Sequence, residues 1–135
     1  MTFVDRFHLQ IAVLESGEPL RAFDEFTADH LVMYDNDVVF AANKAEGRAK
    51  QLPFFDAATS INGRIEKAAV CEDANDASSG IGVFLNQFSF VTGNGKSVQI
   101  DGLVWQRWQG GAVVEERFYR DDLKVEKIEA GILSL

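Results

Sequence analysis

Apolar residues near the start of the chain recur every three or four positions, which is the period of an amphipathic helix. The members of this set are Phe3, Phe7, Ile11 and Leu14. Thr2 and Asp5 have the spacing of a capping box at the beginning of such a helix, and Ser16-Gly17 ends it. The pattern therefore predicts a first helix with a face rich in phenylalanine.

Two further helices are expected in the first half of the chain. Pro19 suits the first turn of a short helix, whose apolar stripe is Leu20, Phe23 and Phe26. A third helical pattern follows Gly47, with Ala49, Leu52, Phe55 and Ala58. Pro53 lies within this third pattern, where a proline costs about 3 kcal/mol unless it falls in the first turn.

Strand patterns occupy the rest of the chain. A first strand is predicted at residues 30–34, closed by the turn formers Asp35-Asn36-Asp37. Later strands are predicted at residues 64–71, 80–91, 97–108 and 112–120, with residues 72–79 as a polar linker. Asn94-Gly95 and Gly110-Gly111 are hairpin signals, so the last three strands should form an antiparallel meander.

Helices followed by long antiparallel strands indicate an α+β fold in which the helices cover one face of a curved sheet. Repeats and linkers are not visible, so residues 1–135 are interpreted as a single domain. The tail at residues 123–135 could be a last strand or an arm that packs on a second subunit.

Composition narrows the classes of partner. The chain has 21 acidic and 13 basic residues and a formal charge of -8, which repels phosphate backbones and anionic lipid, so neither nucleic acid nor a membrane is expected as a partner. Eleven of the aromatic residues are Phe, against two Trp and two Tyr, which favours a deep apolar interior. The single Cys71 excludes an internal disulfide, and the first twenty residues lack an export signal, so a cytoplasmic location is expected.

Metal and nucleophile motifs are missing from the sequence. His8 and His30 are the only histidines, and neither has a ligand partner at metal-site spacing, so no metal and no cofactor is expected. Cys71 lacks a nucleophile motif, and no serine lies in G-x-S-x-G. Residues 93–96 form a hairpin turn between strands rather than a phosphate-binding loop.

Three segments in order resemble the SnoaL-like branch of the nuclear transport factor 2-like superfamily. They are Val13-Leu14-Glu15-Ser16-Gly17-Glu18, then residues 26–35 followed by Gly47-Arg48, and residues 108–115 followed by Asp121. The resemblance runs from about Phe3 to Asp121. It implies a cone-shaped roll in which a curved sheet wraps the first helix around an apolar pocket. Members include ketosteroid isomerases, polyketide cyclases, dehydratases and proteins that only bind or assemble, so the fold alone does not decide function.

The resemblance also implies two catalytic carboxylates. Asp35 is in the position of the isomerases' general base, and desolvation beside an apolar pocket would raise its pKa as such a base requires. Asp121 matches an aspartate that SnoaL-like cyclases use as an acid or base. The alternatives are that Asp35 only caps a solvated turn, and that Asp121 pairs with Arg117 to fix the end of the sheet.

Side chains alternate across strands, which assigns the remaining candidates to faces. In the first strand, the residues predicted to face the pocket are Leu31, Met33 and Asp35. In the strands at 80–91 and 97–108, the corresponding residues are Phe84, Asn86, Phe88 and Phe90, and Val104, Gln106 and Trp108. On the last strand, one face is predicted to be shared by Val113, Glu115, Arg117, Tyr119 and Asp121. The candidate substrate-binding residues are Phe7, Met33, Asn86, Gln106, Trp108, Arg117 and Tyr119. Gln10 and Val104 stand where the isomerases carry their oxyanion-hole donors, which disfavours steroid isomerisation.

Two functions are consistent with these residues. One is a cofactor-free isomerase, cyclase or dehydratase that acts on a small, mostly apolar metabolite with a carbonyl group. The other is a non-catalytic ligand-binding or dimerisation domain. Leu103, Trp105 and Arg107 are expected on the outer face of the sheet, where an aromatic residue between these neighbours has the composition of a homodimer interface.

Overall fold

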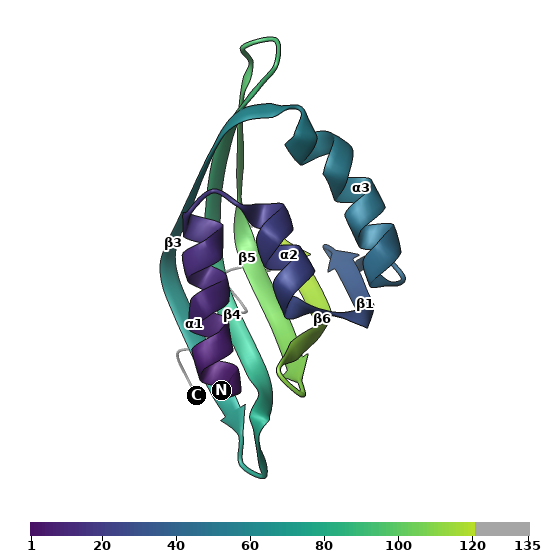
Figure 1. The fold of residues 1–135 in the computed structure, drawn as a ribbon, viewed down its shortest axis with the longest axis vertical. Helices are drawn as coiled ribbons and strands as arrows, with labels where there is room; N and C mark the ends of the chain where they lie inside the picture. Colours follow the sequence, from purple (N-terminus) through teal and green to yellow (C-terminus); the bar gives the residue numbers. More distant parts are fainter. Residues whose placement is uncertain (121–135) are drawn as a thin grey trace.

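A computed structural model describes residues 1–120, which form three helices and one six-stranded sheet (Figure 1). The helices are α1 (Phe3–Glu15), α2 (Pro19–Phe26) and α3 (Lys44–Asp56). The strands are β1 (Thr27–Asp35), β2 (Val38–Ala41), β3 (Ala58–Asp73), β4 (Asp76–Thr92), β5 (Ser97–Gln109) and β6 (Ala112–Tyr119). No helix within residues 1–120 is long and apolar enough to cross a membrane.

Local sequence sets the ends of the helices. Thr2 and Asp5 form the predicted capping box at the start of α1, with the Asp5 amide donating to the Thr2 hydroxyl at 3.2 Å. The third helix begins earlier than predicted, at Lys44, because the Asn43 side chain caps it by accepting from the Glu46 amide at 2.9 Å. It also ends before Ala58, which belongs to β3, so that part of the prediction was wrong.

The sheet has the strand order β2-β1-β6-β5-β4-β3. The predicted meander of β4, β5 and β6 is confirmed, and β3 continues it on the far side of β4. Every neighbouring pair is antiparallel except β1 and β6, which are parallel. The α+β class with a curved sheet is therefore confirmed, with one parallel pair where a purely antiparallel sheet was expected.

Two connections differ from the sequence prediction. The polar linker at residues 72–79 is instead a tight hairpin, since β3 and β4 are separated only by Ala74 and Asn75, and the Asp73 carboxylate accepts from the Asn75 amide at 2.9 Å. An additional strand, β2, follows Asn36 and Asp37, which turn the chain with φ of 48° and 69°. Polar residues that pair in long exposed strands carry little hydrophobic signal, which explains the first miss.

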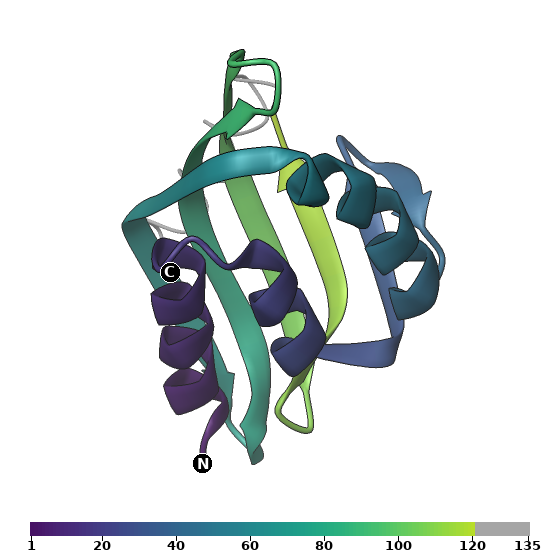
Figure 2. The ribbon, with the colours of Figure 1, turned by 45° about the horizontal axis from the view of Figure 1, so that its top comes forward.

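The helices lie on the concave face of the curved sheet (Figure 2). In this arrangement α1 runs along β3 and β4, and α3 lies on the side of β1. Phe3 and Phe7 of α1 are fully buried, and the Phe3 ring lies 5.5 Å from Trp108. Gly82 lets α1 approach closely, because a Cβ at that position would lie 2.3 Å from the Phe7 ring. The phenylalanine surplus therefore fills the space between helices and sheet.

A bulge changes the faces of β6. Val113 pairs with Trp108, but Glu115 pairs with Arg107, so Val114 is an extra residue in the ladder. Beyond this point the alternation is reversed, and Glu116 and Phe118 turn inward opposite Gln106 and Val104. The prediction that Val113 shares a face with Glu115, Arg117 and Tyr119 was therefore wrong.

Candidate functional site

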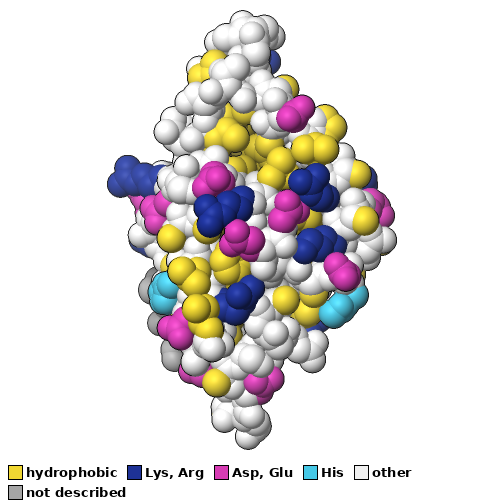
Figure 3. Space-filling view, viewed as in Figure 1, with side chains coloured by type: hydrophobic (Ala, Val, Ile, Leu, Met, Phe, Trp, Pro, Cys, Tyr) yellow, Lys and Arg dark blue, Asp and Glu magenta, His cyan; other side chains and the backbone are white. Residues whose placement is uncertain are grey.

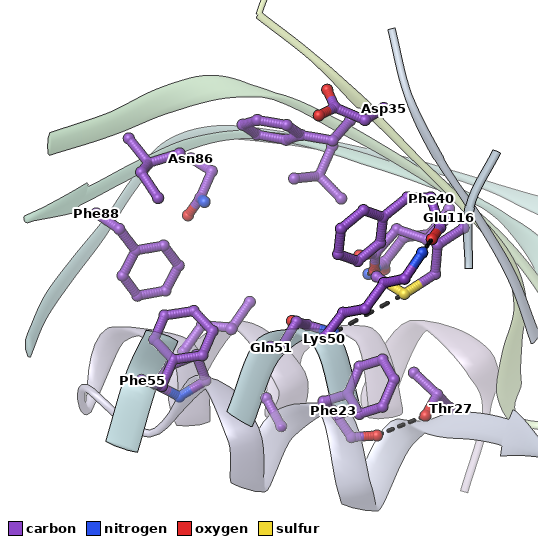
Figure 4. A pocket seen from close by; sticks show the side chains of 18 of the residues that line it. Phe23, Thr27, Asp35, Phe40, Lys50, Gln51, Phe55, Asn86, Phe88 and Glu116 are labelled. Carbon is purple, nitrogen blue, oxygen red and sulfur yellow. Dashed lines mark hydrogen bonds between the residues drawn. The ribbon is translucent and has the colours of Figure 1, made fainter. Parts of the chain in front are cut away.

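A cavity of about 390 Å³ lies between the helices and the concave face of the sheet (Figure 4). This volume falls within the range of small-molecule pockets. Its walls are mainly aromatic and aliphatic, with Phe23 from α2, Phe40 from β2, Phe55 from α3 and Phe84 and Phe88 from β4. On the helical side of the molecule, apolar side chains gather next to α3, while acidic and basic side chains are interspersed below them (Figure 3).

Asp35 reaches this cavity from the end of β1, on the same side as Leu31 and Met33, as predicted. Its Oδ2 accepts from the Arg120 guanidinium at 2.5 Å. Its Oδ1 is buried and has no hydrogen-bond partner among residues 1–120. The turn itself is made by the two following residues. Asp35 is thus neither a fully solvated turn residue nor a fully paired carboxylate.

Glu116 is a second carboxyl in the cavity wall, and sequence reasoning missed it. Its Oε2 accepts from the Gln106 amide at 2.7 Å. Burial raises the pKa of the Glu116 carboxyl above its usual range, and the bond from Gln106 opposes this effect only in part. The residue is half-buried, and it lines the cavity.

The polar residues Gln10 and Asn86 also line the cavity. Gln10 lies on α1 and Asn86 on β4, and both are buried. The side-chain oxygen of each has no hydrogen-bond partner in the described part of the chain. An unpartnered buried oxygen is costly, by about 1–3 kcal/mol, so both amides are suited to a ligand that donates hydrogen bonds. Figure 4 shows Asn86 beside Phe88, at the end of the cavity away from Glu116.

The other candidate binding residues occupy different places. Met33 and Gln106 line the cavity with Asn86, whereas Phe7 and Trp108 lie in the packed core behind the wall. Arg117 and Tyr119 do not line the cavity, since the bulge turns them to the other face, where both bond to Asp37. The predicted site residue Asp121 lies outside the described residues, as does the tail at 123–135.

The cations in the cavity wall already have carboxylate partners. The Lys50 Nζ lies 3.2 Å from Oε1 of Glu46 and donates to the Phe40 carbonyl oxygen at 2.6 Å. The Arg120 guanidinium forms an ion pair with Asp35. The described residues contain no cluster of three or more His, Cys, Asp and Glu side chains that could hold a metal ion. The wall of the cavity is therefore mainly apolar, and its cations Lys50 and Arg120 each have a carboxylate partner.

A signal for Glu116 exists in the sequence. Val113-Val114-Glu115-Glu116 places two apolar residues and then two acids in succession, which strict alternation across a strand cannot accommodate. Such a doubling indicates a bulge after which one acid of the pair faces inward. Which acid turns inward depends on the position of the extra residue, and only the pairing with β5 defines that position.

Comparison with known proteins supports the fold. No family model and no curated protein matches the sequence. Among solved structures, a cystatin-fold protein of Novosphingobium aromaticivorans has a TM-score of 0.66 and 11% identity, over 89% of this chain and 99% of that one. The chain has the nuclear transport factor 2-like fold. A nuclear transport factor 2-like protein of unknown function from an Exiguobacterium species matches with a TM-score of 0.62 and 17% identity, over 90% and 99% of the two chains.

A third solved structure carries a functional label. It comes from a Jannaschia species, and its provisional name is SnoaL-like polyketide cyclase. Its TM-score is 0.63 at 12% identity, over 93% of this chain and 89% of that one. At such identities the likeness concerns the fold, and the function of this chain must be argued from its own cavity.

Proposed function

We propose that this chain is a SnoaL-like protein that binds a small, uncharged, mostly apolar molecule carrying a carbonyl group and acts on it without a cofactor. The reaction class is isomerisation, cyclisation or dehydration, each of which begins with removal of a proton next to a carbonyl. The observation that carries the proposal is Oδ1 of Asp35, which is buried without a hydrogen-bond partner among residues 1–120, in a residue that lines a cavity of ligand size.

Asp35 is the proposed base. Arg120 binds Oδ2 and so fixes the side chain, while Oδ1 has no partner among residues 1–120, and a carbon acid bound against Asp35 would give its proton to this oxygen. The phenylalanines around the cavity give the reacting atoms apolar surroundings. Asp121, the other predicted acid or base, remains a prediction from the resemblance, and Arg117 and Tyr119 are less well placed for binding than Met33, Asn86 and Gln106.

A non-catalytic binding or dimerisation domain is the second candidate. It is favoured by Gln10 and Val104, both of which line the cavity but supply no pair of strong acidic donors for an oxyanion. This function predicts ligand binding without any proton removal, so the two candidates differ in one measurable step.

Two uncharged ketones test the proposal. Propionyl-dimethylaminonaphthalene is a fluorescent naphthyl ketone whose emission reports binding. With β-tetralone in heavy water, removal of the proton next to the carbonyl leads to deuterium uptake, which is measured by mass spectrometry. The wild-type protein should bind the first and accelerate deuterium uptake by the second. Asp35→Asn should abolish the acceleration, a loss of about 100-fold or more, with nearly unchanged melting temperature.

The matched control is Asp101→Asn, which changes an exposed aspartate of β5 that does not line the cavity. Its exchange rate should equal that of the wild type. Binding of the naphthyl ketone without any exchange would favour the non-catalytic binding function. Failure to bind either ketone would contradict both the proposed enzyme and a ketone-binding domain, and would leave only the dimerisation domain. A large drop in melting temperature in Asp35→Asn would show that the side chain is structural.

A further inference from the structure

Glu116 differs from the other carboxyl of the cavity in having no cation beside it. No ion pair involves Glu116 within the described residues, whereas Asp35 is held by Arg120. We propose that Glu116 is the proton donor of this site and gives its proton to the carbonyl oxygen of the bound molecule while Asp35 removes a proton from the adjacent carbon. This inference rests on the proposed function and assigns the acid that it requires.

The hydrogen bonds around Gln106 fix which oxygen of Glu116 faces the ligand. The indole N–H of Trp108 can only donate, and it lies 3.1 Å from Oε1 of Gln106, so that atom is the amide oxygen. The Gln106 amide nitrogen must then point to Oε2 of Glu116, at 2.7 Å. Oε2 is occupied as an acceptor, so we place the proton of a neutral Glu116 on Oε1, which takes no part in the hydrogen bond that Glu116 makes among residues 1–120.

The sheet register brings the two carboxyls into working distance of one ligand. In the parallel pair of β1 and β6, Met33 lies opposite Glu116 and Asp35 opposite Phe118. Asp35 and Glu116 are therefore diagonal neighbours on adjacent strands. Figure 4 shows both residues on the side of the cavity away from Asn86 and Phe88, and we place the carbonyl oxygen of the ligand and its neighbouring carbon between the two carboxyls.

The surroundings of Glu116 favour its neutral form. Gln106 of β5 touches it, and the titratable or charged groups that share its cavity are Tyr34 and Asp35 of β1, Lys50 of α3 and Arg120. Lys50 is engaged by Glu46 and the Phe40 carbonyl, and Arg120 by Asp35. Because no cation among residues 1–120 pairs with Glu116, burial dominates and raises the pKa of its carboxyl.

The proposed step balances without any further reactant. The C–H bond next to the carbonyl breaks, and its proton goes to Oδ1 of Asp35. The electron pair forms the C=C bond of an enol as the carbonyl oxygen takes the proton from Oε1 of Glu116. Asp35 ends neutral and Glu116 ends as a carboxylate, and the reverse transfers at another carbon complete an isomerisation.

Glu116→Gln tests this assignment, because Gln retains the shape and the bond to Gln106 but has no acid proton. Exchange of β-tetralone should fall about 100-fold, while binding of the naphthyl ketone persists. In the wild type, deuterium exchange of β-tetralone should decline as the pH rises through the raised pKa of Glu116. Over the same pH range, the fluorescence emission of the bound naphthyl ketone should shift to the blue, because the hydrogen bond from Glu116 to its carbonyl is lost. In Glu116→Gln the emission should not depend on pH.

Glu115→Gln is the control on the same strand, since Glu115 lies on the other face, paired with Arg107 and Arg117. It should behave like the wild type. The assignment of Glu116 would be overturned if Glu116→Gln and the wild type showed the same exchange rate and the same emission at every pH. The proposed function would be unaffected by that result. If the wild type binds the ketone without exchange, the proposed catalysis fails, and the emission profile alone decides whether Glu116 donates to the carbonyl.

Discussion

Glu115 and Glu116 are neighbours in the chain but lie in different environments. Glu115 accepts from the Arg117 guanidinium at 2.6 Å on the outer face of the sheet. Glu116 faces the aromatic cavity and has an amide as its only hydrogen-bond partner in the described structure. Two chemically identical side chains thus have different surroundings: Glu115 is paired with a cation, whereas burial raises the pKa of Glu116.

This contrast predicts how stability depends on pH. The folded state holds the proton of Glu116 to a higher pH than the unfolded chain does, so the contribution of Glu116 to stability is full below its unfolded pKa and is lost as pH rises through the folded pKa. Glu116→Gln should therefore raise the melting temperature more near pH 8 than near pH 4, by roughly 2–8 °C per kcal/mol gained. Thermal unfolding followed by circular dichroism at both pH values measures this, and an equal shift at both would contradict it.

Close approach of α1 to the sheet is the main packing feature at the level of elements. It depends on small residues in the strands, since a Cβ on Gly82 would lie 2.3 Å from Phe7, and a Cβ on Gly63 would lie 2.4 Å from the Leu14 carbonyl. The bulge in β6 is the second feature, because it selects the residues of that strand that face the cavity. The helix–sheet distance and the bulge together shape the cavity.

Gly82→Ala should loosen this packing. The added methyl group has no room beside the buried Phe7 ring, and overpacking of this kind destabilises by about 1–3 kcal/mol. Gly93→Ala is the matched control, because its Cβ would meet only the Ala57 carbonyl at 3.8 Å. Denaturant unfolding of both variants compares the two sites, and similar midpoints would show that α1 adapts without loss.

At the scale of the whole molecule, the outer face of the sheet carries a second apolar cluster. It contains Val83, Leu103 and Tyr119, with Trp105 packed against them. Leu103 is only 1% exposed within the single chain, so it adds no further area to a dimer interface, whereas Trp105 is half-buried and Arg107 is exposed. We therefore expect Trp105 to carry the proposed homodimer contact more than the residues beside it.

Trp105→Glu tests this expectation. A charge at the centre of an apolar interface would be desolvated without a partner, so the variant should sediment as a monomer at concentrations where the wild type is a dimer. Trp105→Phe, which keeps the aromatic surface, should remain dimeric. Analytical ultracentrifugation of the three proteins gives the answer, and an unchanged mass for Trp105→Glu would reject this interface.

The sequence by itself determined the elements whose signals are local. The capping box of Thr2 and Asp5, the Phe face of α1, the meander turns and the inward sides of β1, β4 and β5 all follow from side-chain period and turn chemistry. Only the tertiary structure decided the inward side of β6, the parallel pairing of β1 with β6 and the pairing of Asp35 with Arg120. These features depend on the register between strands far apart in the chain. A bulge of a single residue is enough to place Glu116 in the cavity wall instead of Glu115.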